Sequence, residues 1–243
     1  MLYTERCTHC GACESVCPTG AATSGEGCIH CGRCIDVCIH EARKIVGRVM
    51  TSEEVIKAVL KDRVFYGDTG GVTCSGGEAL TQPEFLKEIL KGCKENAIHT
   101  VLDTSAFCEP TLYQEIIQFV DLAYIDIKCI APEQHKKLTG VSNAWILENI
   151  RYMDANDRAF NIRMPIIPKY NDADELIEET VSFLKRLKTP VKVWLLPFHA
   201  YGKQKYKQIG MRWPMGDMKN LERSALEPVA EKFQKAGLPV EIQ

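Results

Sequence analysis

The sequence has no excess of charge of either sign and no long apolar run. Its 30 Lys and Arg residues oppose 32 Asp and Glu residues, for a formal net charge of -2. This balance argues against a nucleic-acid binder that works by bulk positive charge. No apolar run approaches the roughly 20 residues that span a bilayer, and residues 1–6 lack the apolar core of a signal peptide. We therefore expect a cytoplasmic protein whose partners include neither nucleic acid nor a membrane.

Cysteine, in contrast, is abundant and unevenly placed. The chain has 12 cysteines, and most of them form two C-x2-C-x2-C-x3-C runs, 21 residues apart, near the N-terminus: Cys7, Cys10, Cys13 and Cys17, then Cys28, Cys31, Cys34 and Cys38. Disulfides are a poor explanation, because a cytosolic chain keeps its thiols reduced and such close neighbours are badly placed to bridge. Zinc is the alternative metal, but it fits two separated CxxC pairs better. The spacing is that of the bacterial ferredoxin run, so we predict two [4Fe-4S] clusters.

In two-cluster modules of this kind, the fourth cysteine of each run ligates the other cluster. We therefore expect one cluster on Cys7, Cys10, Cys13 and Cys38, and the other on Cys28, Cys31, Cys34 and Cys17. Four thiolates leave no open iron position, so both clusters should carry electrons without binding substrate.

After residue 43, short apolar segments alternate with helical patterns. The predicted strands lie at 70–78, where the strand runs into a glycine turn, and at 99–103, 122–128, 160–165, 191–197 and 239–242. The predicted helices lie at 51–63, 83–96, 110–119, 144–155, 173–187 and 219–236, the first beginning with a capping box of Thr51 and Glu54. Repeated strand and helix units predict an α/β fold with a parallel sheet, open or rolled into a barrel. We expect a ferredoxin-like domain at 1–46 and an α/β domain at 47–243.

Polar residues lie at the carboxyl end of each of five predicted strands. They include Ser75 to Glu78, Asp103 to Ser105, Asp126 to Lys128, Arg163, and His199. One such strand end is usually a helix cap or a turn. Five in succession favour a functional site, because the chemistry of parallel α/β proteins gathers at the carboxyl ends of the strands.

These segments, taken in order, resemble a known family. The likeness runs from Cys7 to about Gly210 and includes FY-x2-GGVT-x-SGGE-x-L-x-QPEF at 65–85, DTS at 103–105, DIK at 126–128, R-x-P-x-IP-x-YND at 163–172 and LPFH at 196–199. The chain resembles the radical S-adenosylmethionine enzymes that activate glycyl radical enzymes, of the pyruvate formate-lyase activating enzyme type with a two-cluster ferredoxin insert.

The resemblance implies a role for each of nine residues. Gly76, Gly77 and Glu78 would receive the amino group of S-adenosylmethionine. Asp103, Thr104 and Asp126 would lie near its methionyl carboxylate, where two acids beside a carboxylate need a cation between them. Lys128 and Arg163 would be the cationic partners of that carboxylate, and His199 would contact the adenine.

One family motif is absent from these 243 residues. The family holds a third [4Fe-4S] cluster, which chelates S-adenosylmethionine, on a C-x3-C-x2-C run upstream of the ferredoxin insert, and this sequence has no such spacing. The implied fold is therefore a partial (β/α)6 barrel that lacks its first strand. The four remaining cysteines are expected to be buried core side chains: Cys74, Cys93, Cys108 and Cys129.

Two functions follow from these features. The first is a glycyl-radical-enzyme activating enzyme, a radical-SAM oxidoreductase that is truncated and inactive alone. Its partners would be a glycyl radical enzyme as protein substrate and a reduced flavodoxin or ferredoxin as electron donor. The alternative is an iron-sulfur electron-transfer or docking subunit without radical catalysis.

Overall fold

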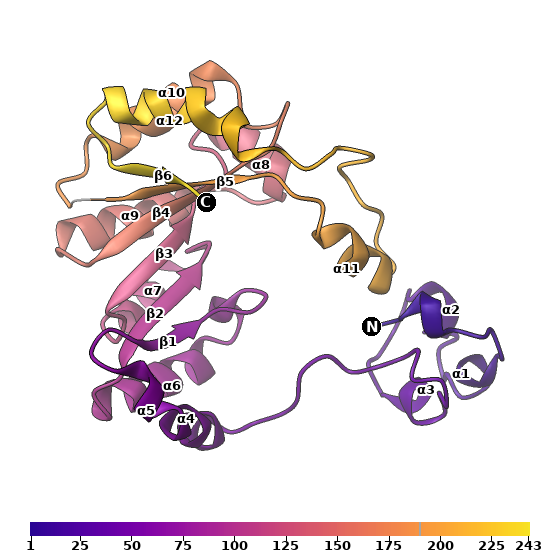
Figure 1. The fold of residues 1–243 in the computed structure, drawn as a ribbon. Helices are drawn as coiled ribbons and strands as arrows, with labels where there is room; N and C mark the ends of the chain where they lie inside the picture. Colours follow the sequence, from indigo (N-terminus) through magenta and orange to yellow (C-terminus); the bar gives the residue numbers. More distant parts are fainter. Residues whose placement is uncertain (190) are drawn as a thin grey trace. The chain divides into compact units, whose positions relative to one another are not determined.

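The computed structural model describes residues 1–189 and 191–243 and divides them into two compact units (Figure 1). The larger, which we call the sheet unit, comprises Met50–Phe198 and Leu221–Gln243. The smaller, the cysteine unit, comprises Met1–Val49 and His199–Asn220. The second segment of the cysteine unit lies outside the expected 1–46 domain. It is joined to the N-terminus by a hydrogen bond in which Leu2 N donates to Gln208 O at 2.8 Å.

Among the described residues, six strands form one sheet, and their spatial order is their order in the sequence. All neighbouring strands are parallel. The strands are β1 (Gly71–Cys74), β2 (His99–Thr104), β3 (Leu122–Asp126), β4 (Phe160–Ile166), β5 (Val193–Pro197) and β6 (Val240–Ile242). The expected α/β class with a parallel sheet is confirmed.

The two faces of this sheet differ in burial. Along β4, Phe160, Ile162 and Met164 are fully buried, whereas Asn161 and Arg163 are half-buried. The same alternation runs through β2, β3 and β5. We call the buried face the outer face, because helices cover it, and the half-buried face the inner face.

Two helices of the sheet unit precede β1, and further helices alternate with the strands after it (Figure 1). In the sheet unit they are α4 (Ser52–Lys61), α5 (Arg63–Tyr66), α6 (Pro83–Glu95), α7 (Pro110–Ile117), α8 (Pro132–Thr139), α9 (Ala144–Ala155), α10 (Asp174–Leu184) and α12 (Glu227–Lys235), with 3-10 turns η2 (Ala79–Thr81) and η3 (Arg223–Leu226). The main core packs the outer-face residues of the strands against α6, α7, α9, α10 and α12 and includes Leu102, Ile125, Ile150, Phe160 and Phe233. Helices α4 and α5 pack against α6 in a second, smaller cluster. The strands alternate in burial with a period of two and the helices with a period of 3.6, which is why the sequence pattern predicted the strands and most of these helices.

Local sequence explains where two of the helices begin. Thr51 N donates to Glu54 Oε2 at 2.9 Å and Glu54 N donates to Thr51 Oγ1 at 3.2 Å, so the predicted capping box at the start of α4 is confirmed. Pro83 begins α6, as expected for a residue that needs no N–H partner in the first turn.

The helix predicted at 219–236 is wrong at its beginning. Glu222 is extended, with ψ of 147°, and only the 3-10 turn η3 precedes α12. Pro228 lies in the first turn of α12, where it has no N–H to bond to a preceding turn, so a continuous helix through it is unfavourable. The sequence pattern also missed α8, whose eight residues are mostly polar, and α11 (Gly202–Gln208).

The cysteine unit has short elements and a repeated backbone. Its elements are η1 (Thr4–Arg6), α1 (Ala12–Ser15), α2 (Ala21–Ser24), α3 (Arg33–Asp36) and α11. Three pairs of residues 21 positions apart share positive φ angles: His9 and His30 at 55° and 53°, Gly11 and Gly32 at 75° and 80°, and Gly20 and Glu41 at 70° and 51°. The two cysteine runs therefore have the same local conformation.

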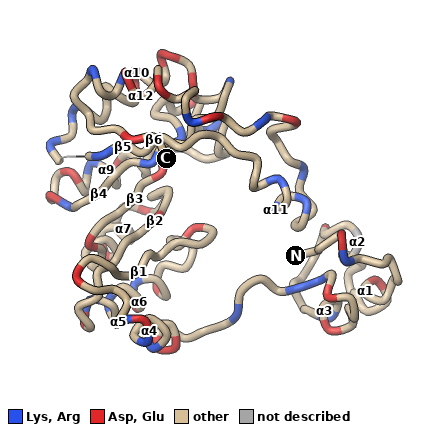
Figure 2. Tube along the Cα trace, in the orientation of Figure 1, with Lys and Arg blue, Asp and Glu red and all other residues tan. Residues whose placement is uncertain are grey.

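Acidic and basic residues are interspersed along both units, in keeping with the small net charge (Figure 2). Among the described residues, no helix has both the length and the apolar character that crossing a bilayer demands.

Candidate active site and cysteine cluster

The glycine turn after β1 presents Glu78 to the end of β2. Gly76 has a φ of 129°, a conformation that residues with a Cβ rarely adopt, and this lets the chain turn sharply after Ser75. Glu78 then caps η2, because its Oε1 accepts a hydrogen bond from Leu80 N at 3.2 Å. The sequence thus uses a glycine to place a carboxylate at the carboxyl end of the sheet.

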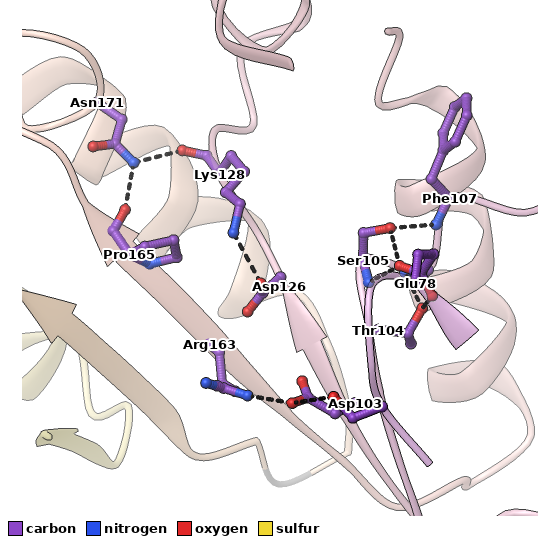
Figure 3. A network of polar contacts seen from close by, with 12 residues as sticks. Glu78, Asp103, Thr104, Ser105, Phe107, Asp126, Lys128, Arg163, Pro165 and Asn171 are labelled. Atoms are coloured by element: carbon purple, nitrogen blue, oxygen red, sulfur yellow. Dashed lines mark hydrogen bonds and ion pairs between the residues drawn. The ribbon is translucent and has the colours of Figure 1, made fainter. Parts of the chain in front are cut away.

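Three further hydrogen bonds hold the Glu78 carboxylate (Figure 3). Thr104 Oγ1 donates to Oε1 at 2.7 Å, while Ser105 donates to Oε2 through its N at 2.8 Å and its Oγ at 2.7 Å. A carboxylate has about four acceptor positions, and four donors meet this one. An ammonium group at this position would have to share the oxygens with Thr104 and Ser105.

Two ion pairs lie on the inner face beside this network (Figure 3). Arg163 Nη1 donates to Asp103 Oδ2 at 2.7 Å, and Ser75 Oγ donates to the same oxygen at 3.3 Å. Lys128 Nζ donates to Asp126 Oδ2 at 2.8 Å. The four side chains are between 26% and 31% exposed, so water screens both pairs and each stabilises the fold only modestly. The two ion pairs place two cations and two anions at the ends of adjacent strands.

The structure therefore brings together most of the predicted residues in the sheet unit. Asp103 and Arg163 meet although 60 residues separate them, because β3 alone lies between their strands. Thr104 contacts Glu78, whereas its neighbour Asp103 on the opposite face contacts Arg163. His199 belongs to the cysteine unit, where its ring stacks on that of Tyr201 with a centroid separation of 4.4 Å.

Three residues that support this site were not singled out as site residues from the sequence. Ser105 makes two of the bonds to Glu78. Asn171 is fully buried, donates through Nδ2 to Lys128 O and Pro165 O at 2.7 Å each, and accepts from Ile167 N at 2.7 Å (Figure 3). Asn149 is also fully buried and donates to Ala106 O and Cys108 O at 3.0 Å. Ser105 and Asn171 lie within the DTS and YND segments, but no sequence signal marks Asn149.

In the cysteine unit, a cavity of about 200 Å³ opens among the cysteines. Its lining includes all four members of one predicted crossed set: Cys7, Cys10, Cys13 and Cys38. Arg43 also lines it and donates through Nη2 to Ala22 O. Among the described residues, no three Cys, His, Asp or Glu side chains are arranged so that they could hold a metal ion as they stand. The thiols share a cavity but would have to draw closer to ligate a cluster.

The pKa of the fourth cysteine of each run is lowered, whereas the pKa of the four cysteines outside the runs is raised. Hydrogen bonds from the backbone N–H groups of Thr19, Ala22 and Ala21 lower the pKa of Cys17. Around Cys38, burial acts to raise the pKa, but the N–H groups of three following residues outweigh it and the pKa is lowered. Thiolate is the form that binds metal.

Burial has the opposite net effect on the four spare cysteines. It raises the pKa of Cys93, Cys108 and Cys129, which are buried, and with a smaller contribution from Cys93 it raises the pKa of Cys74 to about 11. These thiols are protonated at neutral pH, so they are poor candidates for metal ligands.

Comparison with known proteins shows the family of this chain. Residues 4–184 match the profile of the Radical SAM superfamily. The choline trimethylamine-lyase activating enzyme of Oleidesulfovibrio alaskensis is 36% identical over an alignment that covers 100% of this chain and 83% of that protein. The trans-4-hydroxy-L-proline dehydratase activating enzyme of Clostridioides difficile is 37% identical, with coverage of 100% and 84%.

Solved structures extend the likeness to the fold. A domain of a pyruvate-formate lyase-activating enzyme from Bacteroides vulgatus superposes with a TM-score of 0.59 at 29% identity, and the match covers 71% of this chain and 98% of that domain. A radical SAM methyltransferase from Sphaerobacter thermophilus has a TM-score of 0.60 at 14% identity, with coverage of 82% and 59%, and shares the fold alone.

The chain therefore has the fold of a radical SAM domain, with a parallel sheet, a glycine turn after its first strand and charged residues at the strand ends. The cofactors of this superfamily are a [4Fe-4S] cluster and S-adenosylmethionine. Within that superfamily, the chain belongs to the family of glycyl-radical-enzyme activating enzymes.

Proposed function

We propose that this chain binds S-adenosylmethionine at the carboxyl ends of β1 to β4 and carries two auxiliary [4Fe-4S] clusters in its cysteine unit. One observation supports the S-adenosylmethionine site: seven polar side chains lie together at adjacent strand ends, namely Glu78, Thr104, Ser105, Asp103, Arg163, Asp126 and Lys128. In the family's reaction, S-adenosylmethionine is reduced by one electron to give methionine and a 5'-deoxyadenosyl radical, which takes a hydrogen atom from a glycine Cα of the partner.

The residues of this chain would bind and orient the methionyl group. The peptide groups of Gly76 and Gly77 can approach the ammonium closely because neither residue has a Cβ. Thr104 and Ser105 hold Glu78 beside the turn, so its charge stays near that ammonium. Lys128 and Arg163 supply the positive charge that a carboxylate needs. Asp103 and Asp126 keep the two cations in place before the carboxylate arrives. His199, at the start of the cysteine unit's second segment, is proposed to contact the adenine.

The eight N-terminal cysteines would hold the auxiliary clusters in crossed sets. Support comes from the cavity that Cys7, Cys10, Cys13 and Cys38 line together, and from the shared backbone conformation of the two runs. Anaerobic reconstitution should give about 8 iron and 8 sulfide per chain. A value near 12 would reveal a third cluster, and one or two zinc ions instead of iron would refute the assignment. Cys38→Ser should perturb the cluster held by Cys7, Cys10 and Cys13, and assignment of that serine to the other cluster would refute the crossing.

The electron source is proposed to be a reduced flavodoxin or ferredoxin, and the partner a glycyl radical enzyme. The relatives named above are activating enzymes for a lyase and a dehydratase, which supports a partner of this class.

Formation of 5'-deoxyadenosine tests the proposal. The 243 residues contain no C-x3-C-x2-C run, so the chain reduced with dithionite should produce none from S-adenosylmethionine. Fusion of an N-terminal segment that carries such a run should enable production. 5'-Deoxyadenosine from the chain alone, above a no-protein control, would mean that other cysteines hold an open iron site. Failure of the fusion protein to produce it would favour the alternative of an electron-transfer or docking subunit.

A further inference from the structure

The two cysteine runs differ at a position close to the fourth cysteine of each. Ala22 follows Cys17 by five positions, and Arg43 follows Cys38 by the same interval. Ala22 is buried and Arg43 is half-buried. The two runs share their backbone conformation, so at this position a repeated module has a cation in one half and a methyl group in the other.

Arg43 joins the loops of both fourth cysteines. Its guanidinium donates through Nη2 to Ala22 O. Against the effect of burial, the N–H group of Arg43 is one of three that lower the pKa of Cys38. The N–H group of Thr19, and with it that of Ala22, lowers the pKa of Cys17. Because the crossed ligand sets exchange these two cysteines, Arg43 lies where the sets cross.

The positive charge of Arg43 is directed mainly at one of the two sets. Arg43 lines the cavity of about 200 Å³ together with what we call the first set: Cys7, Cys10, Cys13 and Cys38. Burial acts to lower the pKa of the guanidinium, but a hydrogen bond to Cys13 and the charges of Cys13, Cys34 and Cys7 raise it. Of these three cysteines, Cys34 alone belongs to the second set: Cys28, Cys31, Cys34 and Cys17. Glu14 also lines the cavity, but it is exposed, so water and salt screen its charge.

We propose that Arg43 makes the cluster of the first set easier to reduce than the cluster of the second set. A cluster gains a negative charge on reduction, so a cation beside its thiolates favours the reduced form and raises the reduction potential. An electron from reduced flavodoxin or ferredoxin would then rest on the first-set cluster, which is reduced by one electron as the donor is oxidised by one. This inference rests on the two clusters of the proposed function and concerns the difference between them.

A redox titration of the anaerobically reconstituted 243-residue chain tests the proposal. The reduced clusters are followed by electron paramagnetic resonance, and the wild type should show two separate one-electron midpoint potentials. Arg43→Gln replaces the guanidinium by a neutral amide, so the higher potential should fall and the lower one should change less. We expect the equilibrium constant for reduction of the first-set cluster to fall about tenfold, which is a shift of about 59 mV for a one-electron couple.

Three kinds of control variant make the result specific. Arg43→Lys keeps the charge and should keep most of the wild-type difference between the two potentials. Arg33→Gln removes an exposed cation next to Cys34 and should leave the higher potential unchanged. Cys10→Ser and Cys31→Ser each replace a ligand of one set, so the potential that each of them moves most assigns the two values to the two sets.

Iron and sulfide content distinguishes failure of this proposal from failure of the proposed function. A wild type with much less than about 8 iron and 8 sulfide would refute the two-cluster function itself. With both clusters present, equal potentials in the wild type, a higher potential that belongs to the second set, or an unchanged higher potential in Arg43→Gln would overturn the role of Arg43. If Arg43→Gln does not retain both clusters, Arg43→Lys decides: the wild-type potentials support the proposal, and loss of the difference between them overturns it.

Discussion

The two units of this chain are stabilised in different ways. In the sheet unit, a continuous core from Leu80 to Phe233 is buried between the strands and their helices. In the cysteine unit, the buried apolar residues among those described are three alanines: Ala21, Ala22 and Ala42. Larger apolar side chains of that unit, such as Ile39 and Ile45, are 85% and 69% exposed. A unit with so small a core depends on other bonds, and eight cysteines are available to supply them through metal.

The cysteines of the two units also differ, in their exposure and in the pKa of their thiols. The N-terminal thiols are exposed or half-buried, and backbone N–H groups lower the pKa of two of them. The thiols of the sheet unit are packed with apolar side chains, and burial raises their pKa. One residue type is therefore proposed to ligate metal in one unit and is a small core residue in the other.

Removal of iron should have the largest effect, and it should be confined to one unit. Anaerobic chelation leaves the cysteine unit without its metal–thiolate bonds, so we expect it to unfold as a whole while the sheet unit stays folded. Limited proteolysis of the apo-protein, read by mass spectrometry, should cut within Met1–Val49 and His199–Asn220 and leave Met50–Phe198 protected. The iron-loaded protein is the control. Equal resistance of both forms would show that the cysteine unit folds without metal.

A cavity created in the main core should destabilise the sheet unit and leave the cysteine unit unaffected. Phe160 on β4 is 2% exposed, and Phe160→Ala should lower the free energy of unfolding of the sheet unit by about 3–5 kcal/mol. Urea unfolding measures the loss. Phe107→Ala removes a partly exposed ring and should cost about 0.5 kcal/mol or less. Under native conditions the visible absorption of the clusters should be the same in both variants. Loss of iron from Phe160→Ala alone would mean that the two units fold as one.

The sequence predicted the strands of the sheet unit well because each has a short apolar pattern bounded by turns and polar residues. Strands β2 to β5 lie within one or two residues of the predicted bounds. The sequence-based prediction failed where the apolar pattern is weak. Helix α8 buries mainly His135, a polar residue, so no apolar stripe marks it. The prediction of a helix at 219–236 did not take into account that Pro228 has no N–H to bond to the preceding turn.

The candidate site was predictable as a set of residues but not as a set of contacts. Strand ends and family motifs identified Asp103, Asp126, Lys128 and Arg163, whereas the pairing of Asp103 with Arg163 depends on the register of three strands.

The smallest expected effect is a pH dependence that belongs to the sheet unit alone. His135 on α8 is 2% exposed, and its Nδ1 lies 3.2 Å from Cys129 O, which can only accept, so Nδ1 carries the proton of the neutral ring. Burial lowers the pKa of His135. The hydrogen bond to Cys129 opposes this shift, and the charge of Lys128 adds to it.

The unfolded chain therefore takes up a proton near pH 6.5 that the folded chain resists, so the free energy of unfolding falls as the pH drops below about 6.5. The slope is at most about 1.4 kcal/mol per pH unit. His135→Asn keeps a donor for Cys129 O but cannot titrate, so it should flatten the slope in urea unfolding at about pH 7.5, 6.5 and 5.5. His99→Asn changes an exposed histidine on β2 of the same unit and serves as the control. If His135→Asn keeps the wild-type slope between about pH 7.5 and 5.5, the buried imidazole is not its source.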